Sequence, residues 1–299
     1  MRLMKSAALF LCVIAVFAQS DLKTLPVQGN VHVLMSATGN TTVQVGPEGV
    51  VLVDTQTEAM APRVIAEVRK LTDKPVLYIM NTSLDAKNTG GNAALVKLGA
   101  TPSSPGAPAT VAHEAVFNRM STDKSVLPAN WPTTEYYLPT KDFFLNGEAV
   151  VLTHFPNAHT DGDSVVFFRR SDVLVVGELF SPESFPKIDL AAGGSINGLL
   201  NALNQILALT VPGRMQEGGT KVIPGHGRIC EEAEVVEYRD MVTIIRDRIQ
   251  DMLNRKLTLE QVQMARPTLD YDAEYGNNAA ETKGFVEAVY KSLLAEKSK

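Results

Sequence analysis

Short apolar runs and turn-forming residues divide the first part of the chain into strand-like and helix-like segments. Strand-like runs at 31–35, 41–45 and 50–54 are separated by turns that contain Gly, Asn and Pro, and they predict three strands. Apolar residues at helical spacing then predict a helix over 62–71, a short buried strand at 76–80 and a helix over 92–98. This order of strands and helices is typical of a layered α/β fold.

The second part of the chain repeats the pattern. It predicts strands at 143–145, 149–155, 164–168 and 173–176, and helices at 196–209, 235–255, 258–264 and 279–295. Between the two parts, residues 124–139 contain three prolines and Trp131, and we interpret them as a surface excursion that covers a site. No change in composition marks a linker, so we predict a single domain over residues 21–299.

Residues 1–20 have the features of a secretory signal peptide. Arg2 and Lys5 precede an apolar run from 7 to 17, and small residues around Ala18 and Ser20 form a cleavage site. The run is too short to span a hydrocarbon layer of ~30 Å comfortably. We therefore predict a periplasmic or secreted protein that has no membrane span after cleavage.

Composition narrows the classes of partner. The 299 residues include 28 Lys and Arg against 33 Asp and Glu, a formal net charge of −5, and no basic block is present. This balance argues against nucleic acid as a partner and leaves an unidentified small molecule as the expected ligand or substrate. Of the 2 cysteines, Cys12 falls in the predicted signal peptide, so the mature chain retains only Cys230 and forms no internal disulfide.

Three side chains that suit metal binding or catalysis stand in loops after apolar strands. His159 lies in Ala-His-Thr-Asp-Gly-Asp, His226 lies in Pro-Gly-His-Gly, and Glu178 follows the strand predicted at 173–176. Loops at strand ends form the sites of layered α/β folds. Two histidines and an acid at such positions therefore predict a metal or catalytic cluster.

Five motifs, taken in order, resemble the metallo-β-lactamase superfamily from about residue 29 to the C-terminus. They are Val-Leu-Val-Asp-Thr at 51–55, Asn-Thr at 81–82 with Gly-Gly-Asn at 90–92, Ala-His-Thr at 158–160, Val-Gly-Glu at 176–178 and Ile-Pro-Gly-His-Gly at 223–227. The resemblance implies an α/β fold: an αββα four-layer sandwich, in which two mixed β-sheets are flanked by helices. It also implies a metal site at one edge of the sandwich.

The chain departs from that family in its main metal-binding stretch. Family members carry His-x-His-x-Asp-His between the Asn-Thr and Gly-Gly-Asn motifs, and both flanks hold their register here. The four ligand positions are occupied by Ser83, Asp85, Lys87 and Asn88, which form the candidate cleft. The ligand positions later in the chain retain metal-binding residue types. The resemblance implies His159, Glu178 and His226 as metal ligands, with Asp85 as a further one. Glu178 replaces an aspartate and is one methylene longer.

Lys87 weighs against the paired zinc site of the family. An ammonium ~4 Å from a divalent ion would cost on the order of 8 kcal/mol at an effective dielectric of ~20. This would cancel much of the ~10–16 kcal/mol expected for binding a structural zinc. Lys87 instead suits a second role, in which its ammonium replaces the missing metal charge between Asp85 and Glu178.

Two functions remain open at this point. One is a non-catalytic or weakly metal-binding relative that binds a small molecule or a partner. The other is a hydrolase with a rebuilt single-metal site, with zinc the most suitable ion, in which metal-bound water attacks an ester, lactone, lactam or thioester. Ser83 acting as a nucleophile with His159 as its base is a third and weaker reading.

Four further polar residues have simpler interpretations. Asp54 follows a strand, and by the resemblance it organises the site by accepting backbone N–H groups. Asp163 lies in a Gly-containing turn, which explains it. Lys187 and Asp189 lie in a segment that shapes substrate pockets in the family, and we interpret them as pocket residues.

Overall fold

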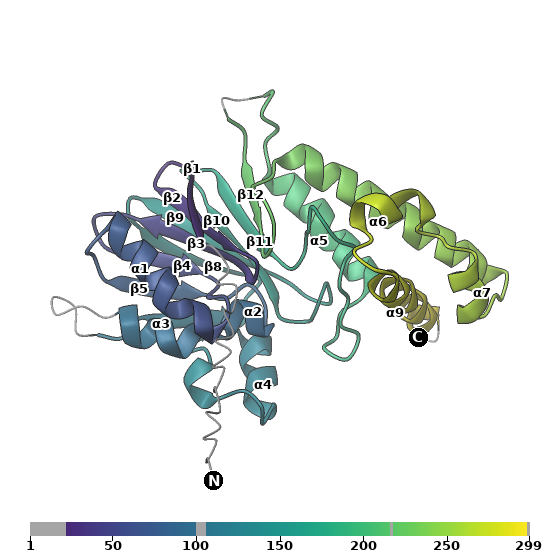
Figure 1. Cartoon of the computed structure of the whole chain (residues 1–299), viewed down its shortest axis with the longest axis horizontal. Helices are drawn as coiled ribbons and strands as arrows, with labels where there is room; N and C mark the ends of the chain where they lie inside the picture. Colours follow the sequence, from purple (N-terminus) through teal and green to yellow (C-terminus); the bar gives the residue numbers. More distant parts are fainter. Residues whose placement is uncertain (1–21, 100–105, 216–217, 298–299) are drawn as a thin grey trace, which may run out of the picture.

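The computed structural model describes residues 22–99, 106–215 and 218–297. The predicted signal peptide lies outside the described residues, as does part of the loop after residue 99. Two sheets face each other, and helices cover both outer sides (Figure 1). This arrangement is the predicted αββα sandwich.

The first sheet has seven strands in sequence order and is mixed. Its strands are β1 (Lys23–Gln28), β2 (Val31–Ser36), β3 (Gly39–Val45), β4 (Val50–Val53), β5 (Val76–Met80), β6 (Ala109–His113) and β7 (Thr134–Tyr136). The strands from β1 to β4 pair antiparallel, and those from β4 to β7 pair parallel. The parallel part places the loops after β4 and β5 at the same edge of the sheet.

The second sheet has five strands in the order β12-β11-β10-β9-β8 and is also mixed. Its strands are β8 (Thr140–Leu145), β9 (Glu148–Phe155), β10 (Asp163–Phe168), β11 (Val173–Gly177) and β12 (Lys221–Pro224). The pair β11 and β12 is parallel and the other pairs are antiparallel. The loops after β11 and β12 therefore leave the sheet side by side.

Helices form the two outer layers. α1 (Ala61–Leu71) and α3 (Asn92–Gly99) share an apolar cluster with the first sheet, and α5 (Ile196–Leu209), α6 (Glu232–Asn254) and α9 (Ala279–Lys297) share one with the second. Shorter helices are η1 (Glu58–Met60), α2 (Ala86–Thr89), α4 (Glu114–Thr122), η2 (Pro128–Asn130), α7 (Leu259–Met264), η3 (Leu269–Tyr271) and α8 (Asp272–Tyr275). No helix in the described part of the chain is long and apolar enough to cross a membrane.

The core between the sheets explains why several strands read as continuous apolar runs. Val53 and Val111 of the first sheet and Val166 and Phe168 of the second belong to one buried cluster. Every residue of β4, β10 and β11 is buried, because one face of each strand meets the other sheet and the opposite face meets helices or loops. The apolar strands that flank the candidate site are therefore rigid supports for its loops.

The segment 124–139 differs from its prediction as a surface excursion. It contains η2 and β7, and β7 pairs with β6 at the edge of the first sheet. Trp131 packs edge-on against Phe117, with ring centroids 5.9 Å apart, so it supports α4. The sequence also gave no clear signal for β1, β6 or α4. β7 spans three residues in a proline-containing stretch, which is too short for an alternating pattern to reveal.

Candidate functional site

Loops from both sheets meet at one edge of the sandwich, and the buried Asp54 holds one of them, residues 81–92, in place. Its carboxylate accepts the backbone N–H of Thr82 at 2.8 Å, the Thr82 hydroxyl at 2.6 Å and the Asn88 side-chain amide at 2.9 Å. Burial raises the pKa of Asp54 to about 7, against the opposing effect of these hydrogen bonds. The predicted role of Asp54 is confirmed, since it fixes the start of the 81–92 loop to the end of β4.

Lys87 and Glu178 form an ion pair at the centre of the site. Lys87 Nζ lies 2.5 Å from Glu178 Oε2, and the side chains are 37% and 9% exposed. Glu178 Oε1 has no hydrogen-bond partner among the described residues. Gly225 makes room for this oxygen, because a Cβ at that position would lie 2.5 Å from it. The expectation that the Lys87 ammonium lies against Glu178 or Asp85 is thus confirmed for Glu178.

Asp85 is held by a different lysine. Its Oδ2 lies 2.8 Å from Nζ of Lys187 and 3.9 Å from Nε2 of His159. Burial disfavours the ionised form of Asp85, yet His159 and the two lysines outweigh burial and hold the pKa below its usual value. The sequence identified Lys187 only as a pocket residue, because nothing in it indicates a partner so far along the chain.

His159 is fully buried and is oriented by Asp163. Its Nδ1 lies 3.1 Å from Asp163 Oδ1, and Asp163 also accepts the Thr160 backbone N–H at 2.5 Å. Burial lowers the pKa of His159. The hydrogen bond to Asp163 and the nearby carboxylates have the opposite and larger effect, so the net pKa lies above the usual value. Turn chemistry alone was therefore an incomplete account of Asp163. The His-x-x-x-Asp spacing was the available signal.

His226 is positioned from the opposite sheet. The side-chain amide of Asn40, on β3, donates to the carbonyls of Pro224 and Gly227, each at 2.9 Å. The Asn40 backbone N–H donates to Gly225 O at 2.8 Å. These three bonds fasten the loop after β12, so that the exposed ring of His226 lines a cavity beside Glu178. No motif or spacing in the sequence indicates this role for Asn40.

Ser83 and Asn88 do not reach the cavity. Ser83 is fully buried and its Oγ has no hydrogen-bond partner in the described structure. Asn88 is 1% exposed and points at Asp54. The four residues of the candidate cleft therefore lie at different depths. Lys87 lines the main cavity, Asp85 lines a neighbouring one, and the other two residues lie beneath them.

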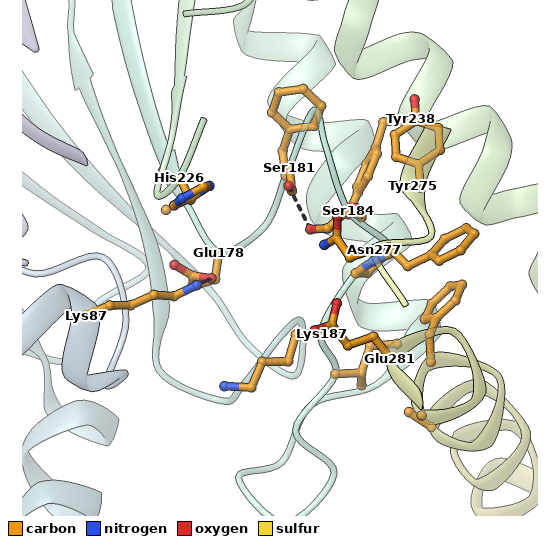
Figure 2. A pocket seen from close by; sticks show the side chains of 18 residues that line it. Lys87, Glu178, Ser181, Ser184, Lys187, His226, Tyr238, Tyr275, Asn277 and Glu281 are labelled. Atoms are coloured by element: carbon orange, nitrogen blue, oxygen red, sulfur yellow. Dashed lines mark hydrogen bonds and ion pairs between the residues drawn. The ribbon is translucent and has the colours of Figure 1, made fainter. Parts of the chain in front are cut away.

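The cavity beside the Lys87–Glu178 pair, called the main cavity because it contains this pair, has a volume of about 510 Å³ and is lined by charged, polar and aromatic side chains. Lys87, Glu178, His226 and Lys187 form the polar end. The rest of the wall combines aromatic rings from the loop after β11, α6, α8 and α9 with the polar side chains of Ser181, Ser184, Asn277 and Glu281 (Figure 2). These rings belong to Phe180, Phe185, Tyr238, Tyr275 and Phe285, and the Phe185 and Phe285 rings stack with centroids 5.1 Å apart. The cavity suits a small molecule with an apolar body and a polar group.

The side chains at the polar end do not fit a metal ion. Across the described residues, no group of three or more His, Cys, Asp or Glu is placed to hold one. The Glu178 carboxylate is paired with Lys87, and the Asp85 carboxylate is paired with Lys187. A catalytic zinc needs about three protein ligands and an open position. The two lysine ammonium groups therefore occupy the carboxylates that would have to be free to bind zinc.

The five motifs of the sequence fall within one segment that matches a known protein family. The sequence profile described as "Metallo-beta-lactamase superfamily" matches residues 37–227. The chain belongs to this superfamily. The matched segment contains every candidate site residue, from Asp54 to His226. A search of curated protein sequences gives no match.

Solved structures of other proteins share the fold of this superfamily member at low sequence identity. A metallo-beta-lactamase from Pontibacter korlensis has a TM-score of 0.60 and 14% identity, over 75% of this chain and 99% of that one. DIM-1 metallo-beta-lactamase has a TM-score of 0.59 and 17% identity, over 75% and 99%. A double mutant of the sec-alkyl sulfatase PisA1 has a TM-score of 0.65 and 14% identity, over 91% of this chain and 50% of that one. These likenesses establish the αββα fold and nothing finer.

Proposed function

We propose that this metallo-beta-lactamase superfamily member is an exported protein that binds a small molecule in its cavity without metal-dependent hydrolysis. One observation carries the proposal. Both carboxylates that a metal would need are ion-paired with lysines, Glu178 with Lys87 at 2.5 Å and Asp85 with Lys187 at 2.8 Å. The positive charge of the site is thereby part of the polypeptide.

The energetics support this exchange of metal for lysine. Glu178 is 9% exposed, and a buried carboxylate without a cation is strongly disfavoured. Lys87 supplies that cation directly, so the folded chain needs no divalent ion for charge balance. A zinc ion would first have to displace Lys87, and at ~4 Å it would repel the ammonium by on the order of 8 kcal/mol at a dielectric of ~20.

Metal content tests the proposal. Zinc, iron and manganese are measured by elemental analysis in protein that has been purified without chelator. We expect clearly less than one metal ion per chain, and no rise in melting temperature on addition of equimolar zinc. Two tightly bound zinc ions per chain, or hydrolysis of a lactam or lactone that is lost with chelator, would overturn the proposal.

Export rests on the features of residues 1–20. Expression of the whole chain, cell fractionation and N-terminal sequencing test it directly. We expect the mature chain in the periplasm or the medium, beginning close to Asp21. A full-length chain that stays in the cytoplasm would contradict export and leave the proposal for the cavity standing.

A single-metal hydrolase is the second candidate, and one distance favours it. His159 Nε2 has no hydrogen-bond partner among the described residues and lies 3.9 Å from Asp85 Oδ2, a separation that two ligands of one zinc ion can have. Lys187→Met would free Asp85 for such an ion. Stoichiometric zinc uptake by this variant, together with metal-dependent hydrolysis of an ester, lactone, lactam or thioester, would favour the second candidate.

A further inference from the structure

A second cavity adjoins the main one at the Asp85–Lys187 ion pair. It has a volume of about 700 Å³, and its wall includes Leu84, Asp85, Met120, Leu127 and Asp189. The loop between β11 and α5 contributes to both cavities, with residues 184–188 lining the first and residues 189, 191 and 192 lining the second. Asp85 lines one cavity, Lys187 lines the other, and their contact at 2.8 Å lies at the boundary.

We infer that the Asp85–Lys187 ion pair is a gate between two compartments of one ligand groove, and that a ligand with an anionic group opens it by replacing Asp85 at Lys187. This inference rests on the proposed function, since it specifies the ligand of the same metal-free site. The ligand class is an elongated molecule that has an aromatic or other apolar body and a single carboxylate, sulfonate or sulfate group.

The gate has the properties of a contact that can exchange partners. Asp85 is 13% exposed, but the Lys187 side chain is 60% exposed, so the lysine side of the pair is open to solvent, where screening weakens an ion pair. The acid is similarly buried in the Lys87–Glu178 pair, but its lysine is only 37% exposed, so this pair remains closed as a fixed part of the wall. Lys187 therefore moves at a smaller cost than Lys87.

Both partners of the gate retain an interaction once it opens. The Lys187 ammonium has three N–H donors, of which the Asp85 contact uses one, and it can pair with the incoming anion. The released Asp85 carboxylate stays close to His159 Nε2, which is 3.9 Å away and otherwise unpartnered among the described residues. The ligand body meets the aromatic rings of the first compartment, including Phe185 and Phe285. The exchange thus leaves neither charge isolated.

Two fluorescent dyes with the same rings test the role of charge. Anilinonaphthalene sulfonate (ANS) carries an anionic group, and N-phenylnaphthylamine (NPN) is its uncharged counterpart. We expect Asp85→Asn to tighten ANS binding by roughly 3–10-fold, because Lys187 loses its competing partner, and Lys187→Met to weaken it by a similar factor. NPN affinity should change by less than about twofold in both variants. Lys187→Gln is the second variant if Lys187→Met is poorly soluble.

Controls separate the gate from general effects on dye binding. Lys97→Met removes an exposed charge on α3, outside both cavities, and should leave both affinities unchanged. Gly284 lines the first compartment, and, apart from its chain neighbours and the backbone of its own helix, no atom of the described residues lies within 4 Å of an added Cβ. Gly284→Leu should therefore fill space in the cavity without a backbone clash and weaken both dyes. Unchanged dye binding in Gly284→Leu would place the dyes elsewhere and overturn the inference.

A longer dye tests whether the compartments join. Bis-ANS, the covalent dimer of ANS, is expected to extend through the opened gate into the second cavity. Ala191→Trp adds a ring to that cavity and should weaken bis-ANS at least threefold while ANS stays unchanged. Equal effects on both dyes, or none on bis-ANS, would contradict a shared groove.

The outcomes distinguish this inference from the proposed function. ANS binding that is lost on addition of EDTA would overturn the proposed function, because the site would then depend on a metal. ANS binding that is unaffected by EDTA, but shifts equally with NPN in the Asp85 and Lys187 variants, would overturn the gate alone.

Discussion

Lys87 Nζ and Glu178 Oε2 lie 2.5 Å apart, and they join α2, which follows β5 of the first sheet, to the end of β11 in the second. The contact links the two halves of the sandwich at the edge where members of the superfamily bind metal. One lysine thus provides both a connection between the sheets and the positive charge of the site. The consequences can be measured separately.

Removal of the ammonium should destabilise the fold. Lys87→Met leaves the Glu178 carboxylate buried without a cation, and we expect the free energy of unfolding to fall by about 1–3 kcal/mol, less than for a fully buried pair because Lys87 is 37% exposed. Urea denaturation at neutral pH measures the change. Lys97→Met is the matched control, and the double variant Lys87→Met/Glu178→Gln should recover much of the loss. An unchanged midpoint in Lys87→Met would show that the ion pair contributes nothing.

Restoring the ligand pattern of the family should restore metal uptake. The variant with Ser83→His, Asp85→His, Lys87→Asp and Asn88→His should bind at least one zinc per chain, since His159 and His226 are already present. Its stability without metal should be lower, because Asn88 donates to the buried Asp54. Elemental analysis after dialysis gives the stoichiometry. The single variant Lys87→Asp serves as the control and should bind less zinc. No uptake by the full variant would mean that the loops no longer hold the family geometry.

The stability of the fold should depend on pH through His113. Burial and the nearby His154 lower the pKa of His113 from 6.5 to about 4, and the two rings stack with centroids 3.5 Å apart. Between these pH values the unfolded chain binds more protons, so this stabilisation is complete above pH 6.5 and is lost as the pH falls toward about 4. The loss should reach about 3 kcal/mol at most.

His113→Asn tests this dependence with the helix cap retained. His113 Nδ1 accepts the Ala115 N–H at 3.3 Å at the start of α4, and an Asn side chain can accept the same bond. Melting temperatures from pH 4 to pH 7 should therefore fall less steeply for His113→Asn than for the wild type. Parallel curves would assign the pH dependence to other groups.

Two helical glycines should respond in opposite directions to alanine. Gly284 in α9 has open space around an added Cβ, so Gly284→Ala should stabilise the fold by about 0.5–1 kcal/mol through helix propensity. Gly198 in α5 packs against the Asn157 carbonyl, with which an added Cβ would collide. Gly198→Ala should therefore destabilise it. Thermal melts of the pair measure both signs, and a destabilising Gly284→Ala would mean that another segment packs against α9 at this position.

The sequence by itself determined several helices and strands, the superfamily, and the residue types that occupy the family's ligand positions. The helix expected at 196–209 and the strand expected at 76–80 agree with α5 and β5, because both are uninterrupted apolar segments with clear ends. The motif order identified the superfamily, and the intact flanks at Thr82 and Asn92 led to the interpretation that Ser83 and Asn88 stand at ligand positions of the family. These features are local, so the residue types and their spacing suffice to reveal them.

The tertiary structure alone decided which charges meet. Asp85 and Lys187 are 102 residues apart, and Asn40 and Pro224 are 184 apart, yet both pairs are in direct contact. Lys87 had two acidic candidates within the predicted site, and the folded chain pairs it with Glu178 and gives Asp85 to Lys187. A sequence specifies the charges and the loops that carry them. Partner choice depends on distances of a few ångströms, which are fixed only when the two sheets pack and bring the loop after β11 over α2.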